Sequence, residues 1–159
     1  MSIVDVNREI WRTVRNSRVP NPINITLTEK QQFNGITIDD VVSEQNFRHF
    51  KNILNRKVFG NRHRRFGTQL KMLVVREVSS GNRHHLHLII EQPFGYTYKK
   101  FRTLVKECWM KTDFGHFQTH FEKPPTIERE DGWVDYILKA RTKDSLESSI
   151  DWSNSTVFH

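Results

Sequence analysis

Hydrophobic and polar residues alternate in four stretches of the chain, a pattern typical of β-strands. The four predicted strands are 23–28, 68–78, 83–92 and 115–122. Between the second and third lies Ser79-Ser80-Gly81-Asn82, whose residue types favour a tight turn, so these two strands are predicted to form a hairpin. Pro93 and Pro124 end the third and fourth strands.

Apolar residues recur at helical spacing in four other stretches, namely 5–17, 43–58, 98–111 and 132–142. Ser43 is a suitable N-cap for the second of these helices, and the polar segment 31–40 is predicted to be a loop. Without the first helix the order is βαββαβ, which predicts an α+β fold with a ferredoxin-like (RRM-like) antiparallel sheet. The N-terminal and C-terminal helices are additions to that unit.

The whole chain, 1–159, is predicted to be a single domain because it is too short for two. The core is expected to span about 23–142. The polar, Ser-rich tail, 143–159, is expected to be partly disordered.

The third predicted strand carries two histidines on one face. Alternation places His85 and His87 together and directs Leu86, Leu88 and Ile90 to the other face. In the predicted topology this strand is central and the helices cover the leucine face, so both histidines lie on the open face. Two imidazoles about 7 Å apart along a strand can bind one ion if a third ligand is present. A half-buried strand whose polar face happens to carry histidines is the alternative.

The hairpin supplies a candidate third ligand. If residue i pairs with residue 162 minus i, Glu77 lies opposite His85 on the same face, and the apolar residues of both strands lie on the helix side. A slip of one residue would bury Glu77 in the core. Glu91 is a weaker candidate, roughly 13 Å along the strand from His87. His84 points to the other face, whereas His116 and His120 could reach the site from an edge strand.

Charge and composition suggest the kind of partner. The formal net charge is +7 over 159 residues, which suits a polyanion such as nucleic acid. A single cysteine, Cys108, allows no intrachain disulfide and favours a reducing compartment. No apolar run is long enough to cross a bilayer, and the N-terminal residues lack the pattern of a signal peptide, so a cytoplasmic location is expected.

The densest basic segment, from Arg56 to Gly67, begins in the last turn of the second predicted helix and continues past its end. Its glycines and aromatic residues predict a loop, and its charge predicts contact with phosphates. A merely solvated loop is the alternative. The candidate DNA-binding residues are Arg56, Lys57, Arg62, Arg64 and Arg65.

Tyr136 and Lys139 are three residues apart and therefore share one face of the last predicted helix. An ion held on the open sheet face would polarise a phosphodiester and stabilise the charge that develops on it. Tyr136 is a candidate nucleophile for that reaction, and Lys139 could orient the phosphate. The alternative for Tyr136 is a core aromatic residue on an amphipathic helix.

In motif order, these residues resemble the HUH endonucleases, and within them the single-tyrosine rolling-circle replication initiators (Rep proteins). Ile25-Thr26-Leu27-Thr28 resembles their first motif, His85-Leu86-His87 their second, and Tyr136-Ile137-Leu138-Lys139 their third. The resemblance covers residues 23 to about 142.

The resemblance implies an activity as well as a fold. Tyr136 would attack a phosphodiester of single-stranded DNA, leaving a 5′-phosphotyrosyl link and a free 3′-OH that starts rolling-circle replication. Lys139 would assist at the phosphate, and Glu77, His85 and His87 would hold Mg²⁺ or Mn²⁺. Thr26 and Thr28, in the first motif, are expected to contact the DNA.

The resemblance also implies partners and a setting. The DNA partner would be a single strand or an origin hairpin, in a bacterial or archaeal cell or in the host of a virus or plasmid. The chain contains no Gly-x-x-x-x-Gly-Lys-Ser/Thr loop, so a host helicase is a candidate partner.

Three other functions compete with this one. A single-domain HUH transposase or a relaxase-like strand transferase would use the same chemistry. A non-catalytic nucleic-acid-binding module could share the ferredoxin-like sheet, although such modules usually stack bases on sheet aromatics. A cupin or non-haem iron enzyme could use the histidines, but would leave the basic charge and the Tyr136–Lys139 pair without a purpose.

Overall fold

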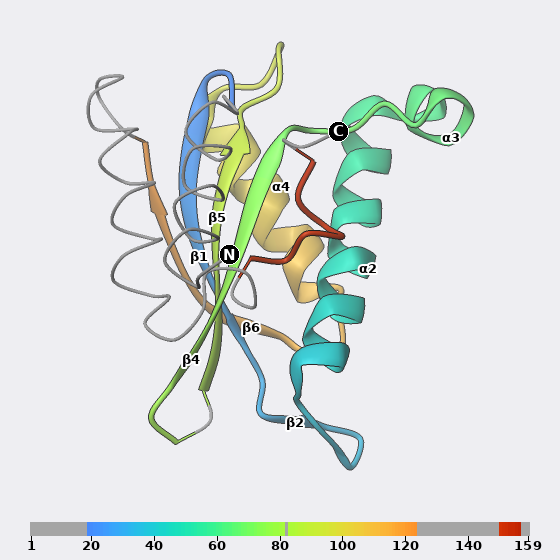
Figure 1. The fold of residues 1–159 in the computed structure, drawn as a ribbon. Helices are drawn as coiled ribbons and strands as arrows, with labels where there is room; N and C mark the ends of the chain where they lie inside the picture. Colours follow the sequence, from blue (N-terminus) through green and yellow to red (C-terminus); the bar gives the residue numbers. More distant parts are fainter. Residues whose placement is uncertain (1–18, 82, 124–149, 157–159) are drawn as a thin grey trace, which may run out of the picture.

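The computed structural model describes residues 19–81, 83–123 and 150–156. The sheet consists of β1 (Pro22–Glu29), β4 (Met72–Ser79), β5 (Arg83–Glu91) and β6 (Gly115–Glu122), all antiparallel, in the order β4-β5-β1-β6. The two long helices, α2 (Asp40–Phe59) and α4 (Tyr98–Met110), cover one face of this sheet (Figure 1). This α+β arrangement is compatible with a ferredoxin-like fold, and the prediction that the first and third long strands are central is confirmed.

The core lies between the sheet and the two helices. Alternate residues of β1, among them Ile25 and Leu27, face Phe47 and Phe50 of α2 and Trp109 of α4. The Phe50 and Trp109 rings meet edge to face, with centroids 5.4 Å apart. The strands therefore present one apolar face to the helices, as their alternation predicted.

Two local predictions between β1 and α2 were wrong. The segment 31–40 contains a small hairpin, β2 (Gln32–Phe33) and β3 (Ile36–Thr37), joined by Asn34 and Gly35 at positive φ. Asn-Gly is the preferred pair for such a two-residue turn. The N-cap of α2 is Asp39, not Ser43, because the Asp39 carboxylate accepts a hydrogen bond from the Val42 amide (2.8 Å).

The basic segment after α2 is a helix and not the predicted loop. α3 (Asn61–Phe66) starts after Gly60 and ends at Gly67, both at positive φ. The Gly67 amide donates to the carbonyl of His63, which closes the last turn. The two glycines that suggested a loop instead mark the ends of a short helix.

Part of the predicted disordered tail is ordered. Residues 150–156 follow the outer edge of β4, where the amides of Asp151 and Thr156 donate to the carbonyls of Val74 and Met72, each at 2.9 Å. In Figure 1 this red segment runs between β4 and α2. The predicted helices 5–17 and 132–142 lie outside the described residues.

No helix within the described ranges is long and apolar enough to span a membrane.

Candidate metal centre

The two histidines and Glu77 lie on the sheet face opposite the helices. Glu77 of β4 pairs with His85 of β5, and every β4–β5 pair follows the register predicted from the hairpin. His87 comes two residues after His85, so its side chain lies on the same face. The predicted grouping of these three residues on one face is therefore confirmed.

The Glu77 carboxylate contacts His87, which lies two residues along β5 from its register partner His85. The distance from Glu77 Oε2 to His87 Nε2 is 2.6 Å, and the two side chains are 19% and 5% exposed. On its other side, His87 Nδ1 lies 3.3 Å from the Thr26 hydroxyl of β1. Each ring nitrogen of His87 therefore has a polar neighbour, the Glu77 carboxylate at Nε2 and the Thr26 hydroxyl at Nδ1.

His85 has a similar neighbour on β1. Its Nδ1 lies 3.4 Å from the Thr28 hydroxyl, and Thr28 is its register partner. Thr26 and Thr28, which the sequence suggested as DNA contacts, thus each meet one histidine ring. The β1 hydroxyls hold the two imidazoles in place, as partners in the outer shell of a metal site do.

The donor set fits a divalent ion, although its geometry is not preformed. Within the described part of the chain, no group of three His, Cys, Asp or Glu residues is arranged to hold a metal. Two imidazoles and one carboxylate on adjacent strands are nevertheless ligands that Mn²⁺ accepts. An ion bound here would replace the direct Glu77–His87 hydrogen bond.

The other candidate ligands lie elsewhere. Glu91, at the far end of β5, accepts a hydrogen bond from the Lys71 amide (2.9 Å). His84 is buried on the helix side of the sheet, as its position in the strand predicted. His120 of β6 pairs with Thr26 and so shares a face with His87, but one strand separates the two histidines. Tyr136 and Lys139 lie outside the described residues.

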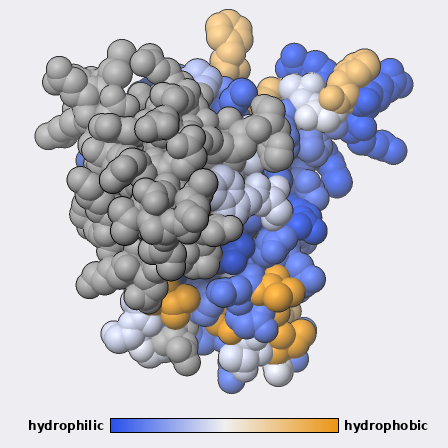
Figure 2. Space-filling view, viewed as in Figure 1, coloured by the Kyte–Doolittle hydropathy of each residue, from blue (hydrophilic) through white to orange (hydrophobic). Residues whose placement is uncertain are grey.

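The basic residues gather at one end of the molecule, on α3 and the last turn of α2. All five candidates are exposed: Arg56, Lys57, Arg62, Arg64 and Arg65. Arg62 lies over the Phe59 ring, 5.5 Å from its centroid, and Phe66 is 79% exposed. Figure 2 shows strongly hydrophilic atoms beside exposed apolar ones at this upper right end. The β4–β5 turn, near Glu77 and His85, is at the opposite end (Figure 1).

Sequence reasoning missed a buried polar cluster on the helix side of the sheet. Glu29, which is 3% exposed, accepts a hydrogen bond from Ser43 (2.6 Å), and Arg76 pairs with Asp151 at 3.2 Å. Burial raises the pKa of the Glu29 carboxyl to about 7, against the opposing effects of the Ser43 hydrogen bond and the Arg76 charge. The alternation of the strands indicates this burial. Glu29 continues the face of β1 that carries Ile25 and Leu27, and Arg76 continues the face of β4 that carries Met72 and Val74.

No protein-family model, curated protein or solved structure matches the chain.

Proposed function

We propose that this protein nicks and rejoins single-stranded DNA by attack of a tyrosine on a phosphodiester, in the manner of the HUH endonucleases, to start rolling-circle replication. One observation carries the proposal: Glu77, His85 and His87 share one face of adjacent strands in the predicted register. The net charge of +7 and the exposed basic end support a DNA substrate.

Glu77, His85 and His87 would hold Mg²⁺ or Mn²⁺. When bound, such an ion supplies positive charge that polarises the scissile phosphodiester. Thr26 and Thr28 orient the imidazoles through their hydroxyls. Because His87 is only 4% exposed, its ring is fixed by its surroundings before any substrate arrives.

Tyr136 is the proposed nucleophile. Its phenolic oxygen forms a bond to phosphorus while the bond from phosphorus to the 3′ oxygen breaks, which gives a 5′-phosphotyrosyl link and a 3′-OH. The phenol loses its proton to a base or to water, and the leaving 3′ oxygen gains one. Lys139 orients the phosphate and balances its charge. The reverse attack by a 3′-OH rejoins the strand.

A non-catalytic nucleic-acid-binding module is the second candidate. The observation that favours it is the burial of His87 together with its contacts to Thr26 and Glu77, which satisfy both ring nitrogens without an ion. In that function, the histidines would only stabilise the sheet.

Covalent capture of DNA separates the two candidates. The protein is incubated with a library of single-stranded hairpins and Mn²⁺, and covalent protein–DNA adducts are resolved by denaturing electrophoresis and sequenced. Wild type is expected to form adducts, and Tyr136→Phe to lose them by about 10³-fold or more, because phenylalanine has no nucleophilic oxygen. Tyr98→Phe, at the start of α4, is the matched control and should form adducts normally.

Adducts that persist in Tyr136→Phe would exclude Tyr136 as the nucleophile. If neither protein forms an adduct but both bind DNA, the non-catalytic module is correct. The sequences captured, origin-like hairpins or transposon ends, distinguish a replication initiator from a transposase.

A further inference from the structure

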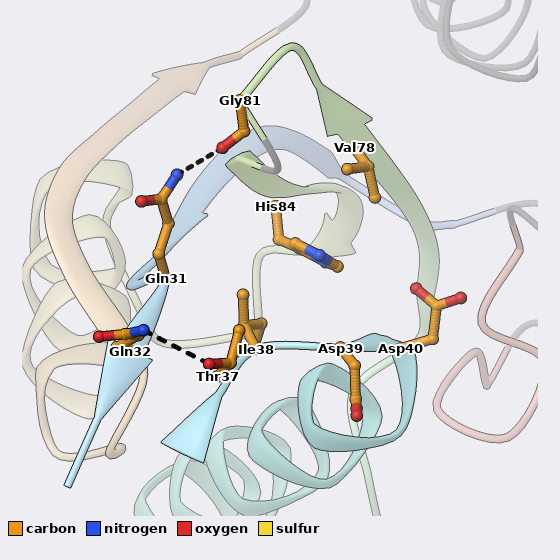
Figure 3. Close-up of a pocket in the computed structure, with 9 residues that line it drawn as sticks. All are labelled: Gln31, Gln32, Thr37, Ile38, Asp39, Asp40, Val78, Gly81 and His84. Carbon is orange, nitrogen blue, oxygen red and sulfur yellow. Dashed lines mark hydrogen bonds between the residues drawn. The ribbon is translucent and has the colours of Figure 1, made fainter. Parts of the chain in front are cut away.

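A pocket of about 600 Å³ opens on the helix side of the sheet, separate from the histidine face. Three segments surround it: the β2–β3 hairpin, the start of α2, and the turn between β4 and β5. Its apolar walls come from Ile38 and Val78, and its polar rim includes Gln31, Thr37 and Asp40 (Figure 3). A volume of this size is typical of small-molecule sites.

His84 is buried in this pocket with an unmatched polar atom. The residue is 7% exposed, and its Nδ1 atom has no hydrogen-bond partner among the residues that the structure describes. Figure 3 shows the imidazole extending between Val78, Ile38 and Asp40. Buried polar atoms are usually paired, so an unpaired one in the wall of a pocket indicates a site for a ligand.

Hydrogen-bond acceptors predominate over free donors in the lining. The amide nitrogen of Gln31 is already used, donating to the Gly81 carbonyl at 2.7 Å, and that of Gln32 points to the Thr37 hydroxyl at 3.4 Å. The Asp40 carboxylate accepts no hydrogen bond from the described residues and points into the space beside His84 (Figure 3). A ligand rich in N–H donors would use these acceptors.

The charge of the lining favours a cation. It contains Asp39 and Asp40 and no lysine or arginine among the described residues, in a chain whose net charge is +7. The N-terminus of α2 lies here and would favour an anion, but the Asp39 carboxylate already caps it. A phosphate would therefore meet two carboxylates, which disfavours a nucleotide or DNA backbone at this place.

We infer that this pocket binds a guanidinium or ammonium group, such as an arginine or lysine side chain of a partner protein or a free polyamine. The Asp40 carboxylate provides the opposite charge, the His84 ring and the glutamine oxygens accept further hydrogen bonds, and Ile38 and Val78 cover the aliphatic part of the ligand. The inference does not depend on DNA nicking, because these residues lie on the other face of the sheet.

Titration of the folded protein with four probes tests the inference. The probes are N-acetyl-arginine amide, spermidine, the neutral isostere N-acetyl-citrulline amide, and the neutral nucleoside cytidine. Binding of each is measured from the changes in the amide chemical shifts of the lining residues. Arginine amide or spermidine should bind and shift these signals, whereas citrulline amide should bind at least ten-fold more weakly. The cation that binds more tightly identifies the source of the charged group, a protein side chain for arginine amide or a free polyamine for spermidine.

Asp40→Asn keeps the side-chain shape and removes its charge, and should weaken binding of the cation at least ten-fold. Glu107→Gln, an exposed position on α4, removes the same charge elsewhere and should leave binding unchanged. Equal thermal unfolding midpoints of both variants show that they are folded. The inference would be overturned if citrulline amide bound as tightly as arginine amide, or if cytidine bound more tightly than either cation. It would equally be overturned if neither cation bound, or if Asp40→Asn kept the affinity of the wild type for the cation.

Discussion

Glu29 shows how a single residue can link the stability of this fold to pH. It ends β1 on the face that packs against the helices, and burial raises its pKa to about 7 from a usual value of 4.5. The folded protein therefore keeps a proton on Glu29 that the unfolded chain has already lost. Between about pH 4.5 and 7 this carboxyl makes the fold less stable as pH rises, and above pH 7 its effect is constant.

Glu29→Gln should remove that dependence. The glutamine oxygen can still accept the hydrogen bond from Ser43, but the side chain cannot ionise. From pH 5 to pH 8, the wild type should lose up to about 3 kcal/mol of unfolding free energy relative to the variant. Urea denaturation at both pH values measures the difference. Parallel pH profiles for the two proteins would contradict the buried, protonated state of Glu29.

Gly115 occupies a position where the chain leaves no room for a side chain. A Cβ atom there would lie 2.0 Å from the carbonyl oxygen of Trp109, which is backbone and cannot move aside. Gly115→Ala should destabilise the fold by about 2 kcal/mol or more, measured by urea denaturation. Gln118→Ala, at an exposed position of the same strand, is the control and should change stability little.

For single residues, the sequence was most informative where the sheet face on which a side chain must lie determines its strand pairing. The pairing of Glu77 with His85 could be predicted because any one-residue slip would place a carboxylate in the core. The 2.6 Å contact of Glu77 with His87 could not be predicted, because the direction of the Glu77 side chain depends on its rotamer. The strand faces indicate that Glu29 and Arg76 are buried, but their partners could not be predicted, because these come from α2 and from residue 151.

At the scale of elements, the segment 150–156 stabilises β4 through side chains as well as backbone. The hydroxyls of Ser155 and Thr156 accept hydrogen bonds from the amides of Val74 and Met72, each at 2.9 Å. The Asp151 carboxylate pairs with Arg76 and also accepts from Asn154. The segment therefore joins the edge of the sheet to the polar cluster beside α2.

Asp151→Asn should destabilise the protein by about 3 kcal/mol, because it leaves the largely buried Arg76 guanidinium without its counter-charge. Denaturant unfolding measures the loss. A matched Asp113→Asn change, at an exposed position before β6, should have little effect. Equal stabilities for the two variants would show that the Arg76–Asp151 pair contributes nothing to the docking of the segment.

The long elements were predictable from periodicity, and the short ones were not. Alternation and helical spacing extend over enough residues to identify β1, β4, β5, β6, α2 and α4. The two-residue strands β2 and β3 are too short to show a period, and the segment 150–156 is polar throughout except for Ile150 and Trp152. Its position depends on hydrogen bonds to a strand about 80 residues earlier, which no local pattern reveals.

At the scale of the whole molecule, the basic end and the histidine face lie apart. This separation predicts that DNA binding and the chemistry on the histidine face can be weakened independently. Replacing Arg64 and Arg65 together by alanine should make the fall of log K with log salt shallower by about 1.4. This corresponds to about 0.7 for each lost phosphate contact with single-stranded DNA. Cleavage at saturating DNA should remain.

Filter binding across a salt series measures that slope. The matched control is Arg48→Ala with Lys111→Ala, which removes the same charge from exposed positions away from α3. An equal fall in slope for both pairs would show that net charge alone attracts the DNA, with no role for α3 in particular.

The docking of residues 150–156 on β4 has a consequence for synthesis of the protein. Ribosomes produce β4 some 70 residues before the segment that covers its edge. Throughout that interval the amides of Met72 and Val74 have no partner from this segment, and an unpaired strand edge invites pairing with other chains. Growing chains are therefore prone to aggregate until residues 150–156 emerge, so slower translation of the residues between β4 and this segment should lower the soluble yield.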